Sequence, residues 1–292
     1  MSEMQGKICV ITGSNSGIGK ETAIDLAKMG ATVVMVVRDK ERGEKAKKEI
    51  MKQSDNTSVD LMICDLSSME SIRHFAEEFK KKYKRLDVLI NNAGASFNKR
   101  EVTPEGFERN FAVNYLGPFL LTHELLDLLK SSAPSRIINV SSGLAKNGRV
   151  DIDDLQGENN FLGTKFYSPS RAPAYDNAKL MLIMFTYELA RRLKGSKVTA
   201  NVLMPGFTAT NLGKNSGSLS SAIMFKMVRP MQQSAKKGAE TSIYLASSDE
   251  VKGITGKCFA KKKETTTCPA SYDEDLQRRL WIKTESLLGL AP

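Results

Sequence analysis

Short apolar runs alternate with amphipathic stretches from one end of the chain to the other. The apolar runs are rich in Val, Ile and Leu and predict strands at 7–12, 32–37, 59–63, 88–90, 136–140, 198–203 and 257–259. Between them, apolar residues recur every three or four positions. This spacing predicts one helix that ends at residue 30 and others at 39–53, 69–83, 104–130, 174–193, 235–245 and 273–288. We expect an interruption of the 104–130 helix at Gly117-Pro118.

The order of these elements predicts the class of fold. Each strand is continuously apolar and is followed by a helix, which is typical of a parallel sheet that helices cover on both faces. The alternation continues without a linker or an internal repeat. We therefore expect one doubly wound α/β domain over residues 1–292.

Three segments depart from the regular alternation. Residues 143–174 are long and irregular, which favours a functional loop around a substrate. Residues 207–233 are apolar and rich in Met, which suits a lid over a hydrophobic substrate. The alternative for 207–233 is packing against the C-terminal helix or a second subunit. Residues 261–292 form a C-terminal extension.

The composition excludes several classes of protein. With 41% hydrophobic and 26% charged residues, the chain is too apolar to be disordered. No apolar run approaches the roughly 20 residues of a membrane span, and the polar N-terminus does not resemble a signal peptide. The 4 Cys are scattered and only 2 His are present, so we expect neither a disulfide framework nor a metal site. These features favour a cytoplasmic protein.

The net charge of +10 has three interpretations, which are nucleic acid, an acidic membrane surface and an anionic ligand. The basic run 80–85 ends a predicted helix, where cations complement the helix dipole. We therefore expect no nucleic-acid partner. The three lysines at 261–263 leave a peripheral contact with an anionic membrane open.

Residues 12–19, TGSNSGIG, join the first predicted strand to the first helix. Glycines let such a turn close tightly and let the backbone approach a pyrophosphate, while the helix offers free N–H groups. The spacing is G-x-x-x-G-x-G, and a purely structural turn is the alternative. The expected phosphate-binding residues are Gly13, Ser14, Asn15, Ser16, Gly17, Ile18 and Gly19.

Two charged residues follow the second predicted strand and bear on the choice of dinucleotide. An acidic residue at this place would bind a ribose 2′-hydroxyl. Here Arg38 comes first and suits a 2′-phosphate, which favours NADP(H). The competing interpretation uses Asp39 for NAD(H). Lys20 could add to the same positive field.

Tyr175 and Lys179 lie four residues apart at the start of a predicted helix, so both project from one face. A neighbouring cation favours a phenolate and lowers the pKa of a tyrosine. Tyr167, followed by Arg171, is the alternative pair. Such a pair suits proton transfer.

Polar residues also follow two predicted strands, at the edge of the sheet where open α/β folds bind ligands. Ser141-Ser142 follows the strand at 136–140, and residues 91–94, NNAG, follow the strand at 88–90. Asn114 lies within a helical stretch where Asn is disfavoured, so it needs a reason. Asn110 is the alternative to it.

Taken together, these motifs resemble the short-chain dehydrogenase/reductase family over essentially the whole chain. The sequence is most similar to retinol dehydrogenase-like members, by residues 37–39, 186–193, 205–213 and 238–247. The family's motifs match residues 12–19, Asp65, Leu66, 91–94, Asn114, Ser142, Tyr175, Lys179, Pro205, Gly206, Thr208 and Thr210.

The resemblance implies a Rossmann-type domain and an NADP(H)-dependent interconversion of a carbonyl and its alcohol. It implies that Tyr175 is the general acid/base and that Ser142 polarises the reacting oxygen. It implies that Lys179 lowers the pKa of Tyr175 and holds the nicotinamide ribose, and that Asn114 supports a proton relay.

The resemblance also implies the remaining contacts and partners. Further cofactor-binding residues are Asp65, Leu66, Asn92, Ala93, Gly94, Pro205, Gly206, Thr208 and Thr210, besides Tyr175 and Lys179. The substrate would be a hydrophobic aldehyde or ketone of the retinal kind, and a homo-oligomer is compatible with the family. A non-catalytic sensor of NADPH is the alternative function.

Overall fold

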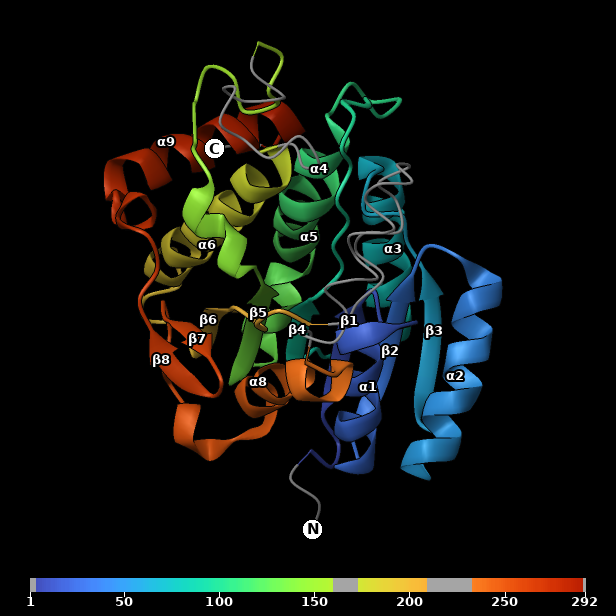
Figure 1. The fold of residues 1–292 in the computed structure, drawn as a ribbon. Coiled ribbons are helices and arrows are strands. Elements are labelled where there is room, and N and C mark those ends of the chain that lie inside the picture. Colours follow the sequence, from blue (N-terminus) through green and yellow to red (C-terminus); the bar gives the residue numbers. More distant parts are fainter. Residues whose placement is uncertain (1–3, 160–172, 209–232, 291–292) are drawn as a thin grey trace.

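The structure is a computed structural model that describes residues 4–159, 173–208 and 233–290. Its strands join one sheet in the order β3-β2-β1-β4-β5-β6-β7-β8 (Figure 1). The strands are β1 Ile8–Thr12, β2 Thr32–Val37, β3 Val59–Ile63, β4 Val88–Asn91, β5 Ser135–Val140, β6 Val198–Leu203, β7 Cys258–Ala260 and β8 Lys263–Thr265.

The strands from β3 to β7 are parallel, which confirms the predicted class of fold. The strands β2, β3 and β6 begin and end at the predicted residues, and the other predicted strands are shifted by a single residue at one or both ends. The last strand, β8, was not predicted and pairs antiparallel with β7.

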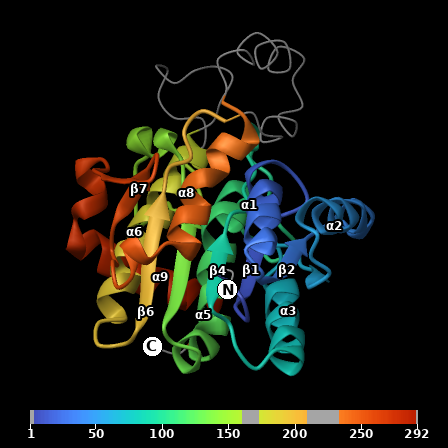
Figure 2. The same ribbon diagram turned by 90° about the horizontal axis from the view of Figure 1, so that it is seen from below.

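Helices cover both faces of the sheet (Figure 2). The helices are α1 Gly17–Lys28, α2 Lys40–Ser54, α3 Met69–Lys82, α4 Arg109–Phe111, α5 Gly117–Ser131, α6 Ala174–Arg192, α8 Ala235–Ser247 and α9 Glu274–Leu288. Buried residues of α1, α2 and α8 form one apolar core with the sheet, and those of α3, α5, α6 and α9 form the other. Each face of the sheet therefore has its own core.

The strand order reverses its direction between β1 and β4, which makes their carboxyl ends the topological switch point of the sheet. The strands β1, β2 and β3 are laid out in one direction from β1, and the chain then returns to place β4 on the other side of β1. Loops leaving β1 and β4 consequently diverge, which is where open α/β sheets bind ligands. Both predicted turns, 12–19 and 91–94, leave from this point.

The predicted helix 104–130 is wrong in two respects. It begins only at Arg109, because the side chain of Glu108 caps it by accepting hydrogen bonds from the N–H groups of Asn110 and Phe111. There is also no break at Gly117-Pro118. The backbone instead passes through a π-helical turn, Ala112–Leu116, and Pro118 lies in the first turn of α5, where its missing N–H is tolerated.

The C-terminal extension contains the edge strand β8 and continues beyond it to the end of the described residues. Its helix α9 packs against α6 on the outer side of the molecule (Figure 1). Within the described ranges of the chain, none of the helices combines the length and the apolar character that a membrane span requires.

Candidate active site

The glycine-rich turn lies between the end of β1 at Thr12 and the start of α1 at Gly17. Gly13 and Gly17 have φ angles of 67° and 56°, which residues with a side chain rarely adopt. A Cβ on Gly13 would lie 2.9 Å from the α-carbon of Ala93, and one on Gly19 would lie 2.6 Å from the carbonyl oxygen of Gly13. Close backbone packing therefore requires glycine at both positions.

Thr12 joins this turn to the one that follows β4. Its hydroxyl oxygen accepts hydrogen bonds from the N–H groups of Asn92 and Ala93, each at 2.9 Å. The side-chain amide of Asn92 donates in return to the carbonyl of Thr12 at 2.8 Å. The two turns at the switch point of the sheet are thus one hydrogen-bonded unit.

The glycine-rich turn fits the pyrophosphate of a dinucleotide. Ser16 is the N-cap residue of α1, yet its side chain makes no capping hydrogen bond, so the first N–H groups of the helix are not used by it. The hydroxyl of Ser14 is buried and has no hydrogen-bond partner within the described part of the chain. Buried polar atoms are normally paired. An anion bound here would accept hydrogen bonds from such donors, while Asn15 is half-buried and Ile18 is buried.

The charged residues that bear on the choice of dinucleotide differ in their contacts. The carboxylate of Asp39 accepts a hydrogen bond from the N–H of Arg42 at 3.0 Å and caps α2. Lys20 forms an ion pair with Glu49 at 2.7 Å. Arg38 is exposed and makes no hydrogen bond or ion pair with any residue that the structure describes. Of these three predicted residues, Arg38 alone has its charge uncommitted in this part of the chain.

Asp65 and Leu66 follow β3 on the same edge of the sheet. The Asp65 carboxylate accepts hydrogen bonds from the N–H and hydroxyl of Ser67, at 2.9 and 2.7 Å. Leu66 is buried in the core below. The structure thus gives both residues a local packing role beside the predicted role in cofactor binding.

Tyr175 and Lys179 lie in the first turns of α6, and both are nearly fully buried. The Lys179 ammonium group lies 5.9 Å from the centre of the Tyr175 ring and donates a hydrogen bond to the carbonyl of Val140, at the end of β5, at 2.9 Å. Burial lowers the pKa of Lys179 to about 7. The alternative pair, Tyr167 and Arg171, lies outside the described residues.

Ser141 and Ser142 follow β5 and differ in their contacts. The hydroxyl of Ser141 is buried and donates to the carbonyl of Lys179 at 2.8 Å. The hydroxyl of Ser142 is half-buried and accepts from the N–H of Leu144 at 3.2 Å, where it caps the short helical turn Gly143–Asn147. Ser141 therefore positions α6, and Ser142 retains the capacity to donate its hydroxyl proton.

Asn114 lies in the π-helical turn and is fully buried. Its amide donates to the carbonyls of Ala95 and Asn110 and accepts from the N–H of Ala95. A Cβ on Gly94 would lie 3.1 Å from Oδ1 of Asn114 and 3.4 Å from Nζ of Lys179. Asn114 and Lys179 therefore approach the same point, and Gly94 leaves room for both.

The alternative to Asn114, Asn110, has another environment. Its side-chain amide makes hydrogen bonds with the backbone of Phe97 and donates to the carboxylate of Glu108. These contacts fix the loop that follows β4. The structure places Asn114, and not Asn110, next to Lys179.

Pro205, Gly206 and Thr208 follow β6. The hydroxyl of Thr208 lies 3.3 Å from the carbonyls of Pro205 and Gly206, and it accepts a hydrogen bond from the side-chain amide of Gln233 at 2.9 Å. Gln233 also donates to the carbonyl of Pro205. Sequence reasoning missed this contact because nothing in the pattern pairs Gln233 with a turn 25 residues earlier.

Some predicted residues lie outside the described ranges. These are Thr210, residues 160–172 of the predicted substrate loop and residues 209–232 of the predicted lid. In the described part of the loop, Leu155 is buried and Gln156 accepts a hydrogen bond from the N–H of Glu108. In residues 4–159, 173–208 and 233–290, no three His, Cys, Asp or Glu side chains gather as a metal site would need.

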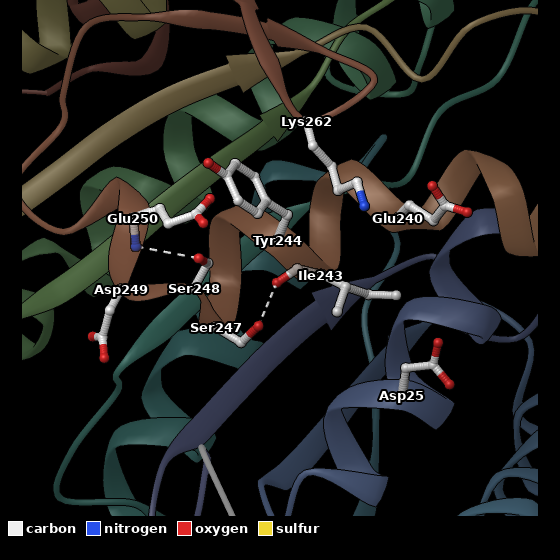
Figure 3. A pocket seen from close by; sticks show the side chains of 9 residues that line it. All are labelled: Asp25, Glu240, Ile243, Tyr244, Ser247, Ser248, Asp249, Glu250 and Lys262. Carbon is white, nitrogen blue, oxygen red and sulfur yellow. Dashed lines mark hydrogen bonds between the residues drawn. The ribbon is translucent and has the colours of Figure 1, made fainter.

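Two cavities of the described residues lie away from the predicted site. One of about 540 Å³ is lined by Asp25, Glu240, Ile243, Tyr244, Ser247, Ser248, Asp249, Glu250 and Lys262 (Figure 3). Its carboxylates outnumber its single lysine, so an anionic dinucleotide would be repelled. The other, of about 1080 Å³, includes Lys7, Arg136 and Lys197 at the amino ends of the strands. None of the predicted site residues lines either cavity.

The amino-acid sequence is similar to those of known proteins over nearly its whole length. A family profile described as short chain dehydrogenase matches residues 7–152. Retinol dehydrogenase 13 of Mus musculus is 42% identical over 290 residues, which cover 98% of this chain and 85% of that protein.

Solved structures are similar over most of the chain. The RhlG/NADP active-site complex of Pseudomonas aeruginosa is 25% identical with a TM-score of 0.69, and the match covers 88% of this chain and 96% of that one. The 3-ketoacyl-(acyl-carrier-protein) reductase of Brucella melitensis, complexed with NADH, is 27% identical with a TM-score of 0.66, covering 87% and 96%.

Burial of Lys179 predicts a pH-dependent cost to stability. Its pKa is about 7 in the folded protein, against an ordinary value of 10.5, so the unfolded chain binds more protons between these values and stability rises with pH. The Lys179→Met variant lacks this effect. Its free energy of unfolding, relative to that of the original protein, should fall by roughly 2 kcal/mol from pH 6 to pH 9.

Urea unfolding at the two pH values measures this difference. Lys194→Met is the matched control, because Lys194 is exposed just beyond the end of the same helix. It should shift stability equally at both pH values. A Lys179→Met difference that does not change with pH would contradict the burial of a titrating ammonium group.

Proposed function

The chain belongs to the short-chain dehydrogenase family, and from this premise we propose that it reduces a hydrophobic aldehyde or ketone to its alcohol with NADPH. It is an oxidoreductase that acts on CH–OH groups and uses a nicotinamide cofactor. The preference for NADP(H), the substrate class and the roles of individual residues are the parts that we propose.

One observation carries the proposal. The ammonium group of Lys179 is buried 5.9 Å from the centre of the Tyr175 ring. Lys179 and Asn114 both approach Gly94, at the carboxyl ends of β4 and β5. Gly94 follows Ala93, and the N–H of Ala93 donates a hydrogen bond to Thr12 at the start of the glycine-rich turn. A phenol, a cation and a glycine-rich turn that fits a dinucleotide are the parts that proton-coupled hydride transfer needs.

Each residue of the proposed active site has a separate role in carbonyl reduction. A bound nicotinamide supplies the hydride to the carbonyl carbon in reduction, and receives it in the reverse reaction. Tyr175 gives its phenolic proton to the carbonyl oxygen as negative charge develops there. Ser142 donates a hydrogen bond to the same oxygen and stabilises that charge. In its protonated form, Lys179 lowers the pKa of Tyr175 through its positive charge. Asn114 supports the return of a proton to Tyr175.

Two observations support NADP(H) over NAD(H). Arg38 has no ion pair with the described residues, so its guanidinium group is available for a 2′-phosphate. The competing residue, Asp39, already uses its carboxylate to cap α2. The RhlG/NADP complex is compatible with this choice, whereas the NADH complex of the Brucella reductase shows that a similar fold also takes the other dinucleotide.

A hydrophobic substrate is supported by sequence and similarity. The segment 207–233 is apolar and rich in Met, and Phe207 at its start is 55% exposed. The similarity to retinol dehydrogenase 13 favours a carbonyl of the retinal kind. We therefore expect long-chain aldehydes and retinal to be reduced faster than small ketones.

Substitution of the proposed acid tests the reaction. The Tyr175→Phe variant cannot donate a proton, so kcat for reduction should fall by at least about a hundredfold while NADPH still binds. NADPH consumption with retinal, aliphatic aldehydes, quinones and steroids measures this. Tyr244→Phe is the control, because Tyr244 lies on α8 and lines the distant cavity (Figure 3). A Tyr175→Phe protein that keeps most of its turnover would refute the role, and NADPH binding without any turnover in the original protein would favour a sensor.

Substitution of Arg38 tests the choice of dinucleotide. Loss of a charge-assisted hydrogen bond to a phosphate should raise KM for NADPH roughly tenfold to a hundredfold, and KM for NADH less than about twofold. Arg42→Ala is the matched control, because Arg42 is also exposed and lies four residues later in the sequence, in the first turn of α2. An unchanged ratio of the two KM values in Arg38→Ala would show that Arg38 does not bind the 2′-phosphate.

A further inference from the structure

The turn that carries Asn114 has an uncommon backbone. Residues Ala112–Leu116 form a π-helical turn between α4 and α5. Such turns are rare and occur frequently at functional sites. This one directs the amide of Asn114 to the strand-end segment at Ala95, with hydrogen bonds to both the carbonyl and the N–H of that residue. Its geometry therefore decides where Asn114 lies.

The next residue, Tyr115, is held by the C-terminal helix. Its hydroxyl lies 2.7 Å from the hydroxyl of Thr284 on α9, and both side chains are fully buried. Thr284 gives its own proton to the carbonyl of Leu280 at 2.7 Å. Tyr115 is consequently the donor to Thr284. Burial raises the pKa of Tyr115, so the phenol keeps the proton that it donates.

Aromatic packing holds the helix α9 against α5 and α6. Trp281, one turn before Thr284, packs against Phe119 of α5 and Phe185 of α6, with ring centres 4.8 and 5.6 Å apart. The guanidinium group of Arg192 covers the indole at 4.3 Å. The packing of Trp281 thus fixes the position of Thr284, which lies 169 residues after its partner Tyr115 in the sequence.

On the basis of the proposed function, we propose that the Tyr115–Thr284 hydrogen bond is a positioning contact. It holds the π-helical turn from the outer side, so that Asn114 remains against Ala95 and close to Lys179. Tyr115 and Thr284 do not touch the reacting atoms. They act through the placement of Asn114.

The Tyr115→Phe variant removes one hydroxyl and leaves the ring and the Thr284–Leu280 hydrogen bond in place. We expect kcat to fall about 3- to 10-fold, the effect of one net hydrogen bond on the reacting geometry, with KM for NADPH within about twofold of the original value. Thr284→Val should give the same decrease. Thr284→Ser keeps the hydroxyl and should restore turnover to within about twofold.

The chain offers a matched control. Tyr187 of α6 makes a similar hydrogen bond, at 3.0 Å, to Thr267 of the C-terminal extension. Thr267 keeps a second partner in Ser271, as Thr284 does in Leu280. Tyr187→Phe therefore removes an equivalent contact between the core and the extension, and it should leave kcat unchanged.

A double-mutant cycle tests whether the effect passes through Asn114. In an Asn114→Ala background, Tyr115→Phe should lower kcat no further. The proposal is overturned if Tyr115→Phe and Tyr187→Phe change kcat equally, or if Tyr115→Phe has its full effect without the Asn114 side chain.

Amide hydrogen exchange separates this proposal from the proposed function. The N–H of Ala95 donates to Asn114 at 3.1 Å, so it should exchange faster in Tyr115→Phe and Thr284→Val than in the original protein and in Tyr187→Phe. If the original protein reduces no carbonyl, the proposed function fails, and exchange at Ala95 still decides the positioning role. Equal exchange in all four proteins would refute that role.

Discussion

The buried ammonium group of Lys179 is the constraint on which the carboxyl edge of the sheet depends. A buried charge is costly unless hydrogen bonds compensate it. The carbonyl of Val140 supplies such a bond at the end of β5, and the missing side chain of Gly94 leaves space for the ammonium group after β4. The hydroxyl of Ser141 fixes the backbone of the lysine itself. The end of β5 and the segments that follow β4 and β5 therefore all lie against the side chain or backbone of Lys179 in α6. The ring of Tyr175 is also close enough to interact electrostatically with the ammonium group.

Features that depend on neighbours in the sequence could be predicted, and those that depend on distant partners could not. The strand at 198–203 follows from its local apolar run, and the turn at 12–19 from the spacing of its glycines. The hydrogen bond between Thr12 and Asn92 joins residues that are 80 apart, and the pattern of apolar and polar residues does not indicate it. Asn114 could be singled out because Asn is unfavourable inside a helix, yet its partner Ala95 and the π-helical turn became evident only in three dimensions.

The basic residues that give the chain its net positive charge have different partners. The basic run at the end of α3 pairs with acids of its own chain, since Lys81 contacts Glu78 at 2.7 Å and Lys82 contacts Asp60. Arg85, the last residue of the run, joins Lys7 in neutralising the buried carboxylate of Asp87. The exposed pairs of Lys81 and Lys82 contribute little to stability, but they reduce the electrostatic field of the basic run. A run of cations in a sequence is therefore a weaker indication of an anionic partner than a single cation without an acid beside it.

The C-terminal extension shows how a segment added after the parallel sheet can become part of a site. Its helix α9 covers α5 and α6 through Trp281, and this packing alone would account for its presence. The same helix brings Thr284 to Tyr115, which is the residue next to Asn114. A π-helical turn has backbone geometry that its own sequence does not strongly favour, so a contact from outside can decide its position. The cluster at the strand ends is consequently fixed from two sides, from within by the turns that Thr12 joins and from outside by α9.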